Sequence, residues 1–352
     1  MRSQTMSRPT RWRVARLSEQ PVVMTGTGWP DYGLLDSGHG RKLESYGSYR
    51  FIRPEPQAMW APRTAEWDAH GEFVPGSDED GGGRWHFDKP VPRDGWPLAR
   101  GDVKFTASCT PFRHLGFFPD MAPVWDWMGQ RYLPGTGRGT SEAGGGVRAG
   151  DPDAAGRNPS DQLPVPLHHP ADGSPPRAGE EFSSLNLFGY TGVGTLALSD
   201  YGPVTHVDAS KKSVAQARAN AALSGMEDRP VRWIIDDAAK FTAREVRRGK
   251  RYDGIILDPP KFGRGPEGEV WRLEEGLPGL LANCRHLLDA ESRFLFLTVY
   301  AVRMSSLALA GLMDEIFADL PGRIEHGDLA VREMGDDGRL LPTAIFARWS
   351  ND

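Results

Sequence analysis

The chain has 352 residues, 39% of them hydrophobic and 25% charged, and a formal net charge of −5. This length favours two domains over a single core, and no apolar run approaches the roughly 18–20 residues that cross a bilayer. Only two cysteines occur, Cys109 and Cys284, which excludes a disulfide framework and a cysteine-based metal site and fits a reducing cytoplasm.

Residues 1–20 are predicted to form a tail or one edge strand. Their arginine-rich beginning lacks the apolar segment of a secretory signal, although a transit peptide would also be rich in arginine. Residues 1–53 hold nine Lys or Arg against four Asp or Glu, so a local basic face is compatible with the negative total charge.

Residues 21–133 are predicted to form a small, β-rich α+β domain. Short apolar segments alternate with turn-forming residues, as in tight hairpins. A hairpin is predicted over 66–87, a strand over 103–108 and a short helix over 124–133. Either core packing or an aromatic platform for nucleic-acid bases would account for six tryptophans in this half. They are Trp60, Trp67, Trp85, Trp96, Trp125 and Trp127.

Residues 134–181 contain ten glycines, eight prolines and no Phe, Tyr or Trp. Such a segment cannot bury enough apolar surface to offset the entropy lost on ordering, so it is predicted to be a disordered linker. His168 and His169 lie within it, but two adjacent histidines without further ligands do not predict a metal site. Residues 182–352 then form the second domain.

The second domain begins with strands and helices in alternation. Its apolar segments at 183–188, 204–207, 231–235 and 252–257 are predicted strands separated by helical stretches. This alternation is the pattern of a parallel sheet with crossover helices.

A helix over 268–288, a strand over 293–299 and a helix over 305–320 are predicted to follow. Strands over 324–333 and 343–349 flank a Gly-Asp-Asp-Gly turn, which predicts a hairpin. The second domain is therefore predicted to hold seven strands, mostly parallel, with an antiparallel hairpin at the end.

Three of the predicted strands end on carboxylates, Asp208, Asp237 and Asp258. In parallel sheets, ligands bind beyond the carboxyl ends of the strands. The glycines after the first strand match neither G-x-G-x-x-G nor a phosphate-binding loop. A ligand with ribose and adenine but no pyrophosphate indicates S-adenosylmethionine, with Asp208 on the ribose and Asp237 near the adenine. The alternative is that these carboxylates cap helix N-termini.

The segment Asp258-Pro259-Pro260-Lys261-Phe262 is the most specific pattern in the sequence. Two prolines restrict the backbone and remove two N–H donors, so the carboxylate and the carbonyls would face a cleft in a preset geometry. Phe262 would pack on a flat ring, and Lys261 would contact a phosphate or polarise a carbonyl. A rigid turn without a ligand is the alternative.

Together these motifs resemble the class I S-adenosylmethionine-dependent methyltransferases. The segments that carry the resemblance are 185–192 (LNLFGYTG), 207–210 (VDAS), 236–238 (DDA) and 258–262 (DPPKF). More narrowly, residues 183–349 are similar to the bacterial 23S rRNA large-subunit methyltransferases that make 5-methylcytosine or 7-methylguanine. Upstream, 114–120 (HLGFFPD) is similar to this family's G-F-F-x-D segment, which closes over the cofactor.

The resemblance implies a seven-stranded Rossmann-like methyltransferase sheet with a C-terminal antiparallel hairpin, preceded by a smaller β-rich α+β domain. It implies that the target base lies near Pro259, Lys261 and Phe262, that Asp258 orients the acceptor, and that no metal takes part. The implied cofactor contacts are Asn186, Gly189, Tyr190, Thr191, Gly192, Asp208, Ala209, Asp237, Ala238, Asp258 and Phe117.

The sequence departs from this family in two places. Members that make 5-methylcytosine carry a nucleophilic cysteine where this chain has 298–301 (TVYA). Carbon 5 of cytosine is a poor nucleophile without a thiolate adduct, so cytosine C5 methylation is not expected. Cys284, among leucines in mid-helix, is predicted to be structural. Residues 20–100 do not match the family's N-terminal RNA-binding module.

The sequence thus predicts a cytoplasmic enzyme that methylates a nitrogen of an rRNA base from S-adenosylmethionine, without a cysteine adduct. One alternative is a methyltransferase acting on a protein or a small molecule. Another is a non-catalytic protein that binds S-adenosylmethionine or RNA. RNA is the expected partner and a membrane is not, and both a monomer and a homodimer fit the sequence.

Overall fold

The computed structural model describes residues 16–76, 82–132, 182–300 and 303–351. The linker predicted over 134–181 lies outside the described residues, as do residues 1–15 of the predicted tail. Nine strands of the described part form one large sheet. They are β1 (Arg16–Leu17), β2 (Val22–Gly26), β10 (Ser184–Leu187), β11 (Val204–Asp208), β12 (Val231–Ile235), β13 (Gly254–Leu257), β16 (Phe294–Val299), β17 (Arg323–Arg332) and β18 (Leu340–Ser350).

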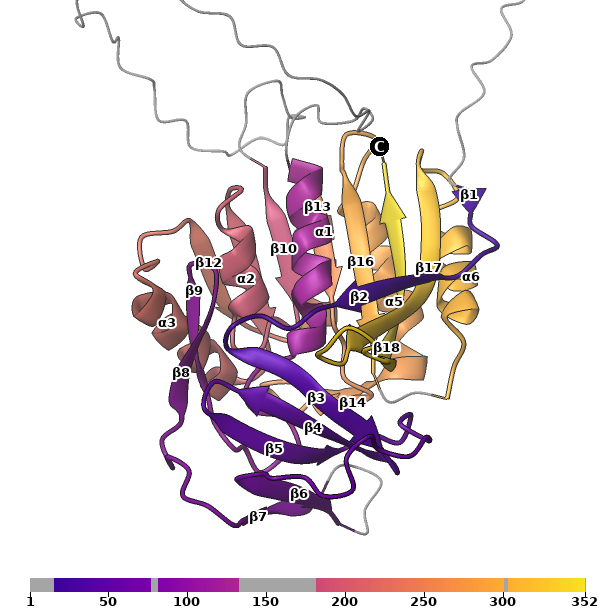
Figure 1. Cartoon of the computed structure of the whole chain (residues 1–352). Helices are drawn as coiled ribbons and strands as arrows, with labels where there is room; N and C mark the ends of the chain where they lie inside the picture. Colours follow the sequence, from indigo (N-terminus) through magenta and orange to yellow (C-terminus); the bar gives the residue numbers. More distant parts are fainter. Residues whose placement is uncertain (1–15, 77–81, 133–181, 301–302, 352) are drawn as a thin grey trace, which may run out of the picture.

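Seven of these strands are the ones that the sequence predicts. The order is β17-β18-β16-β13-β10-β11-β12, in which the last five strands are parallel and β17 and β18 form an antiparallel hairpin (Figure 1). The predicted α/β fold is confirmed. The carboxyl ends of β10 and β13 lie side by side at the centre of the sheet, which is where ligands bind in open α/β folds.

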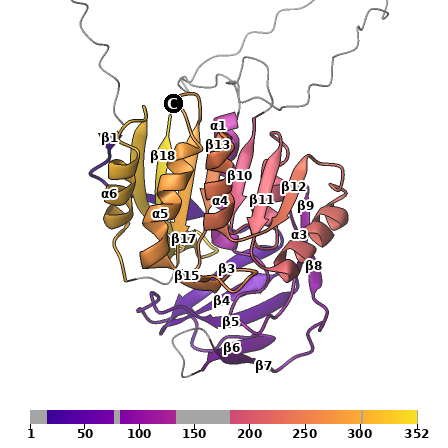
Figure 2. The ribbon, with the colours of Figure 1, turned by 180° about the vertical axis from the view of Figure 1, so that it is seen from behind.

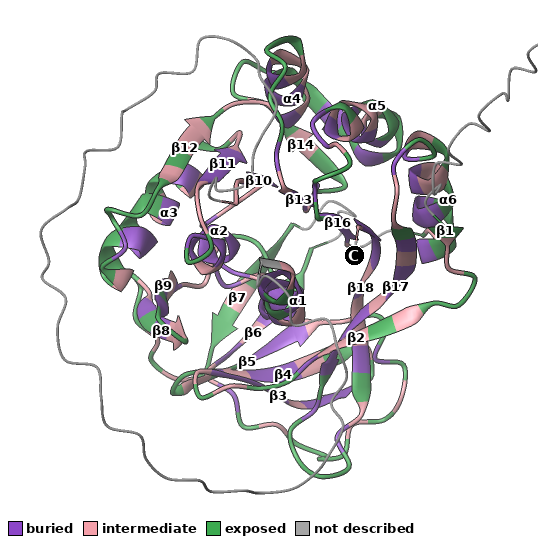
Figure 3. Ribbon diagram, turned by 90° about the horizontal axis from the view of Figure 1, so that it is seen from above, coloured by how far each residue is buried: buried purple, intermediate pink, exposed green. Residues whose placement is uncertain are grey.

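Helices cover both faces of the sheet. One face carries α1 and α2, and the other carries α4, α5 and α6, while α3 lies near the β12 edge (Figures 1 and 2). Their buried sides face the strands (Figure 3). The helices are α1 (Ala122–Tyr132), α2 (Val193–Leu198), α3 (Lys211–Ser224), α4 (Ala238–Arg247), α5 (Leu273–His286) and α6 (Ser306–Ile316), with a 3₁₀ helix, η1, at Pro119–Met121.

Alternation along the strands assigns side chains to the two faces. On β13, Ile255 and Leu257 pack with the core beneath α4, α5 and α6, whereas Ile256 packs with the core beneath α1 and α2. Central parallel strands are buried on both faces and therefore read as continuous apolar runs.

The N-terminal part contributes two strands to the sheet. β1 lies within residues 1–20, for which a tail or one edge strand is predicted, whereas β2 is not predicted. β1 pairs with the beginning of β17, and β2 pairs in parallel with its second half, from Gly327 to Val331. β2 therefore belongs to the large sheet, although residues 21–133 are predicted to form a separate small domain. The physical reason is that β17 is ten residues long and would otherwise expose an unpaired edge.

The remaining N-terminal strands build a smaller sheet beneath the large one (Figure 1). It contains β3 (Tyr32–Gly38), β4 (Arg41–Tyr46), β5 (Tyr49–Pro54), β6 (Gly71–Pro75) and β7 (Gly83–Phe87), and a separate hairpin contains β8 (Trp96–Arg100) and β9 (Val103–Ala107). Tyr46 and Phe51 of the small sheet belong to the same apolar cluster as Phe296 of the large one. The predicted boundary at residue 133 thus does not separate two cores.

The tryptophans of this region pack within the protein. Trp96, Trp125 and Trp127 are buried. Partly exposed Trp67 and Trp85 donate their indole N–H groups to Asp36 and to the Thr110 carbonyl. These contacts favour core packing over an aromatic platform for bases.

A buried ionic cluster joins the small sheet to the β17–β18 hairpin. Arg339 donates to the Asp36 carboxylate at 2.8 Å, to the Glu333 carboxylate at 2.9 Å and to the carbonyl of Ser37. Its guanidinium also lies 5.5 Å from the ring centre of Trp60. We call these five residues the Arg339 cluster. It connects β3 to the large sheet through charged hydrogen bonds shielded from solvent.

The helix predicted over 268–288 begins later than expected. A short antiparallel hairpin of β14 (Phe262–Arg264) and β15 (Val270–Arg272) precedes it, and α5 starts at Leu273. Trp271 alternates inward and is buried, which favours a strand at this point. No helix in the described part of the chain has the length and hydropathy needed to span a membrane.

Candidate active site

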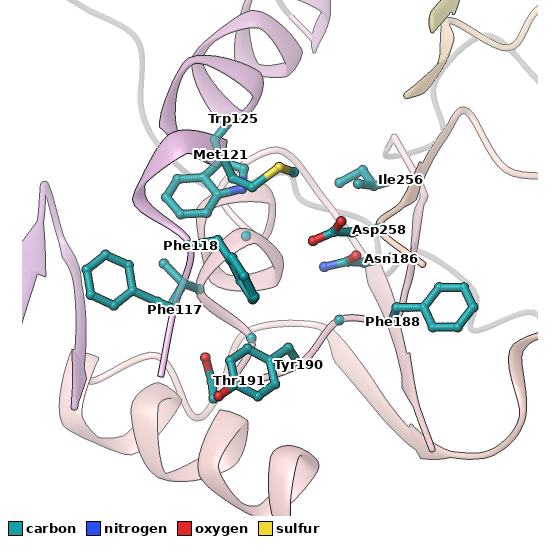
Figure 4. Close-up of a pocket in the computed structure, with 14 residues that line it drawn as sticks. Phe117, Phe118, Met121, Trp125, Asn186, Phe188, Tyr190, Thr191, Ile256 and Asp258 are labelled. Atoms are coloured by element: carbon teal, nitrogen blue, oxygen red, sulfur yellow. The ribbon is translucent and has the colours of Figure 1, made fainter. Parts of the chain in front are cut away.

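A small pocket lies where β10 and β13 end, between the sheet and α1. Its volume is about 50 Å³. Phe118 and Tyr190 project into it from one side, and the polar groups of Asn186 and Asp258 lie together on the other (Figure 4). Its lining consists of Phe117, Phe118, Met121, Trp125, Asn186, Phe188, Gly189, Tyr190, Thr191, Gly192, Val193, Gly194, Ile256 and Asp258.

The turn after β10 holds an unusual backbone. Phe188 and Tyr190 have φ values of 58° and 48°, in the left-handed region that residues with a side chain rarely adopt, and Gly192 has 77°. Each such residue other than glycine costs on the order of 1–3 kcal/mol, and this kind of strain clusters at ligand sites. At Gly189 a side chain would collide with the imidazole of His206. The strained conformation of this turn therefore indicates a ligand site rather than a feature that stabilises the fold.

Asp208, at the end of β11, supports this turn. Its carboxylate accepts from the N–H of Tyr190 at 2.9 Å and from the N–H of Ser210 at 2.8 Å. Burial raises the pKa of Asp208, while these two hydrogen bonds oppose the rise. Ser210, not Asp208, caps α3. The helix-capping alternative therefore does not explain Asp208.

Helix capping does explain the position of Asp237. Its carboxylate accepts from the N–H of Lys240 at 2.9 Å and caps α4. The next residue, Ala238, is the first residue of α4 and is buried. Asp237, Ala238, Asp208 and Ala209 are all absent from the lining of the small pocket. Of these four predicted contacts, only Asp208 is joined directly to the turn.

We expect Asp208→Asn to weaken binding of S-adenosylhomocysteine at least tenfold, or about 1.4 kcal/mol, because the charged acceptor of the Tyr190 N–H is lost. Isothermal titration calorimetry measures this. Ser210→Ala is the matched control, since it removes the cap of α3, at a cost of about 1 kcal/mol in stability, without touching the pocket. Equal affinity in the wild type and in Asp208→Asn would contradict the role of Asp208.

Asp258 lies at the end of β13, before a turn and a strand rather than a helix, so it is not a cap. The residue is partly exposed, but its carboxyl group is enclosed. Burial, and secondly the negative charge of Asp120, raise the pKa of Asp258 to about 8. It therefore carries a proton at neutral pH. Pro259, the next residue, is buried. The carbonyl oxygen of Pro260 accepts a hydrogen bond from the indole N–H of Trp271 at 2.7 Å, which holds the turn in place.

A much larger cleft, of about 1190 Å³, opens beside the small pocket and shares Phe117 and Phe118 with it. We call it the acceptor cleft. Its walls come from the small sheet, from the segment before α1 and from the ends of β16, β17 and β18. Lys261 lines it, whereas Phe262 is 48% exposed on β14 and outside its lining.

The segment before α1 is tied to the strained turn. Thr191 donates its hydroxyl to the Gly116 carbonyl at 2.6 Å, and the hydroxyl of Tyr190 lies 3.2 Å from Nδ1 of His114. Burial, followed by the charges of Arg53 and Arg113, lowers the pKa of His114 to about 4, so it is neutral at pH 7. The predicted closure of this segment over the site agrees with these contacts.

The structure gathers most, not all, of the predicted site residues. Asn186, Gly189, Tyr190, Thr191, Gly192 and Asp258 line the small pocket. Phe117 borders the pocket but is only 3% exposed and points into the core, while Phe118 faces the cavity (Figure 4). The lining residues that were not predicted include His114, Phe118, Asp120 and Tyr300, the first three of which lie in the HLGFFPD segment.

No protein-family model matches the sequence. The crystal structure of the SAM-dependent methyltransferase from Agrobacterium tumefaciens aligns with 100% of this chain and 99% of that chain, with a TM-score of 0.79 and 36% identity. The chain belongs to the S-adenosylmethionine-dependent methyltransferases. A protein from Streptococcus mutans aligns with 91% of this methyltransferase at a TM-score of 0.56 and 13% identity, which shows a shared fold.

Curated relatives match a shorter part of the methyltransferase. Ribosomal RNA large subunit methyltransferase I of Aeromonas salmonicida is 31% identical over 133 residues, which are 37% of this chain and 31% of that protein. The protein of the same name from Shewanella denitrificans is 38% identical over 82 residues, 21% of its length. The chain thus aligns with less than a third of the length of these two relatives.

The site fits the cofactor of the family in its chemistry. Asn186 and Asp258 offer polar groups at one side of the pocket, Tyr190 and Phe118 offer aromatic faces at the other, and the turn allows close backbone approach. At about 50 Å³ the pocket is smaller than the roughly 300 Å³ at which ligand sites begin. The adjoining acceptor cleft, which shares Phe118 with the pocket, therefore has to supply part of the room.

Proposed function

We propose that this methyltransferase transfers a methyl group from S-adenosylmethionine to a nitrogen of an rRNA base, without a covalent cysteine adduct. The observation that carries the proposal is the position of Asp258. Its enclosed carboxyl group lies in the small pocket, and Lys261 of the same turn lines the acceptor cleft. The D-P-P turn therefore bridges the place for the cofactor and the place for the acceptor.

The absence of a thiol from both linings supports a direct transfer. Cys284 is fully buried on α5, and Cys109 is a partly exposed loop residue, and neither lines the pocket or the cleft. Burial raises the pKa of Cys109 to about 12 and raises that of Cys284 further, so both stay protonated at neutral pH. The place of the family's nucleophile falls within residues 298–301 (TVYA), which contain no cysteine.

In this mechanism the protein acts by positioning. When bound, S-adenosylmethionine supplies an activated methyl group that needs no metal to leave. Asp258 and the carbonyl of Pro259 would accept hydrogen bonds from the acceptor and align its nitrogen lone pair. Holding two reactants in line lowers the barrier by several kcal/mol. Lys261 would contact an oxygen or phosphate of the acceptor, and exposed Phe262 would stack on a base.

Exposed cations at the cleft support a nucleic-acid acceptor. Arg113, Lys261 and Arg303 are exposed and line the acceptor cleft, where they can contact phosphates. Exposed Phe112 is stacked on His114, at a ring distance of 5.6 Å, and offers a second aromatic face. A base inside a duplex would have to be flipped out, or be single-stranded, to enter.

One observation favours a small-molecule acceptor instead. The lining of the cleft contains acidic as well as basic residues, and a wall of mixed sign is unusual for a polyanion. Its acidic members are Glu44, Glu55, Asp120, Glu274 and Asp328.

The test compares cells with and without the gene. Nucleosides from 23S rRNA are mapped by mass spectrometry, and RNA, protein and small-molecule fractions of the deletion strain are incubated with the purified enzyme and methyl-labelled S-adenosylmethionine. The proposal expects one methylated base nitrogen to disappear from the deletion strain and label to enter its RNA. Label confined to protein or small molecules would overturn the rRNA assignment, and cofactor binding without any label would overturn catalysis.

Replacing both cysteines tests the mechanism separately. We expect Cys109→Ser with Cys284→Ala to retain methyl transfer within about threefold, because neither sulfur reaches the site, while Cys284→Ala lowers stability by roughly 1–2 kcal/mol through the cavity it leaves. Single-turnover transfer and urea unfolding measure the two effects. A loss of transfer beyond about 100-fold in a folded double variant would restore a thiol mechanism.

A further inference from the structure

Two carboxylates lie on opposite sides of η1. Met121 of this short helix lines the small pocket together with Asp258, whereas Asp120, the residue before it, lines the acceptor cleft. Met121 is held from below by the Thr298 hydroxyl, which lies 3.5 Å from its sulfur. η1 therefore forms a thin wall with one carboxyl group on each side.

Asp120 is 6% exposed and has charged and titratable neighbours on several elements. Burial raises the pKa of Asp120, and the positive charge of Lys42 on β4 opposes this rise only in part. The negative charge of Asp120 also adds to the rise that burial causes in the pKa of Tyr32 and of Tyr46 in the small sheet. The negative charge of Asp120 is also the second cause, after burial, of the raised pKa of Asp258, so the two carboxyl groups interact across η1.

The two members of the pair face different partners. Asp258 borders the pocket for the cofactor, and the acceptor cleft contains Asp120 and Tyr300 but not Asp258. Tyr300 follows β16, and its ring lies 5.3 Å from that of Phe118, which separates the two hollows. The carboxyl group that an acceptor in the cleft meets is therefore the one on η1.

We infer that Asp120 is a further catalytic residue, which accepts the proton released by the acceptor nitrogen as it is methylated. The inference rests on the proposed methylation of a nitrogen that carries hydrogen. Asp258, whose own pKa of about 8 keeps it protonated at neutral pH, then orients the acceptor and does not add a second negative charge to the wall.

The step balances in atoms and charge. The nitrogen lone pair forms the new N–C bond, and the S–C bond breaks with its electrons remaining on sulfur. The methylated nitrogen is then cationic and acidic, and its N–H proton moves to a carboxylate oxygen of Asp120. A carboxylate is basic enough for such a proton, and the product leaves neutral. The open cleft lets Asp120 return the proton to solvent afterwards.

The test compares Asp120→Asn with the wild-type chain in single-turnover transfer at pH 5–9, using whichever fraction of the deletion strain accepts label. We expect a rate about 10²–10⁴-fold lower, as for loss of a general base, and loss of the acid limb of the pH profile. Affinity for S-adenosylhomocysteine should stay within about threefold, and Asp120→Glu should restore part of the rate. Asp126→Asn is the matched control, an exposed carboxylate on α1 that pairs with Arg100.

The outcomes separate this inference from the proposed function. If the wild type labels no RNA but labels another fraction, the rRNA assignment fails, and the variants are still compared on that fraction. If Asp120→Asn transfers at the wild-type rate, or is slowed equally at all pH values with the acid limb intact, the inference is overturned. Infrared spectra of the free enzyme give a reading without an acceptor. A protonated carboxyl band at pH 7 that is absent from Asp258→Asn supports a protonated Asp258 beside Asp120. If the wild type shows no such band, the inference is overturned.

Discussion

Asp258→Asn is expected to reduce methyl transfer by about 10²–10⁴-fold and, in the same protein, to raise the melting temperature at alkaline pH. The loss of activity is expected because the amide of Asn replaces one carboxyl oxygen with an NH₂ group, which can neither accept a hydrogen bond from the acceptor nor ionise. Cofactor affinity should change little, since the amide keeps the volume of the side chain. Full activity in this variant would end the orientation role.

The gain in stability has a defined pH dependence. Burial and the charge of Asp120 raise the pKa of Asp258 to about 8 in the folded protein, whereas an unfolded Asp titrates near 3.9. Between these values the folded state binds a proton that the unfolded state does not, so this residue destabilises the fold progressively as the pH rises from about 4 to about 8. Asn cannot ionise and escapes the penalty.

Melting temperatures of the wild type and of Asp258→Asn, recorded from pH 4 to pH 9, measure this effect. The two proteins should melt together near pH 4, and the variant should melt higher by an increasing margin up to about pH 8. A margin that does not change with pH would contradict the enclosed carboxyl. Opposite effects on activity and stability at one residue are typical of a site that is strained for function.

Arg339→Ala is expected to destabilise the protein by about 3–5 kcal/mol. The substitution leaves the buried carboxylates of Asp36 and Glu333 without their shared cation, and an uncompensated buried charge is far more costly than the pair is favourable. Arg63 lies 3.2 Å from Glu333 and compensates part of the loss, which favours the lower end of the range. Urea unfolding measures the free energy.

Arg229→Ala is the matched control, because its ion pair with Asp200 is exposed and such pairs contribute about 0–1 kcal/mol. Hydrogen exchange adds a local reading, since loss of the Arg339 cluster should speed exchange in β3 and β4 more than in β10 and β13. Equal unfolding free energies for the two arginine variants would mean that the cluster does not hold the small sheet in place.

Local patterns in the sequence predict the central sheet well. Apolar runs that end on Asp208, Asp237 and Asp258 correspond to β11, β12 and β13. The run is continuous in β13, which is buried on both faces, whereas β12 is a partly exposed edge strand. The hairpin of β17 and β18 is equally local. β2 could not be found in this way, since its partner is distant in the chain and nothing in residues 22–26 specifies a parallel neighbour.

Sequence spacing singles out the turn and the D-P-P segment, and the structure brings the turn and Asp258 to one pocket. Spacing does not tell which of two adjacent phenylalanines faces a cavity, and Phe118 rather than Phe117 does so. Nor does it reveal that Phe188 and Tyr190 adopt left-handed conformations, because such strain is imposed by the surrounding structure. Asp120 gains its role only when η1 is placed between two hollows.

The pairing of β2 with β17 has a consequence for how the chain reaches its native state. Val22 pairs with Gly327, roughly 300 residues later, and a side chain at Gly327 would collide with the backbone of Val22. Contacts between such distant segments form late and slow folding. As the chain leaves the ribosome, the small sheet emerges long before the hairpin that anchors it. We expect truncation before β17 to leave an aggregation-prone chain, so the catalytic wall at η1 is completed only after the last strands are made.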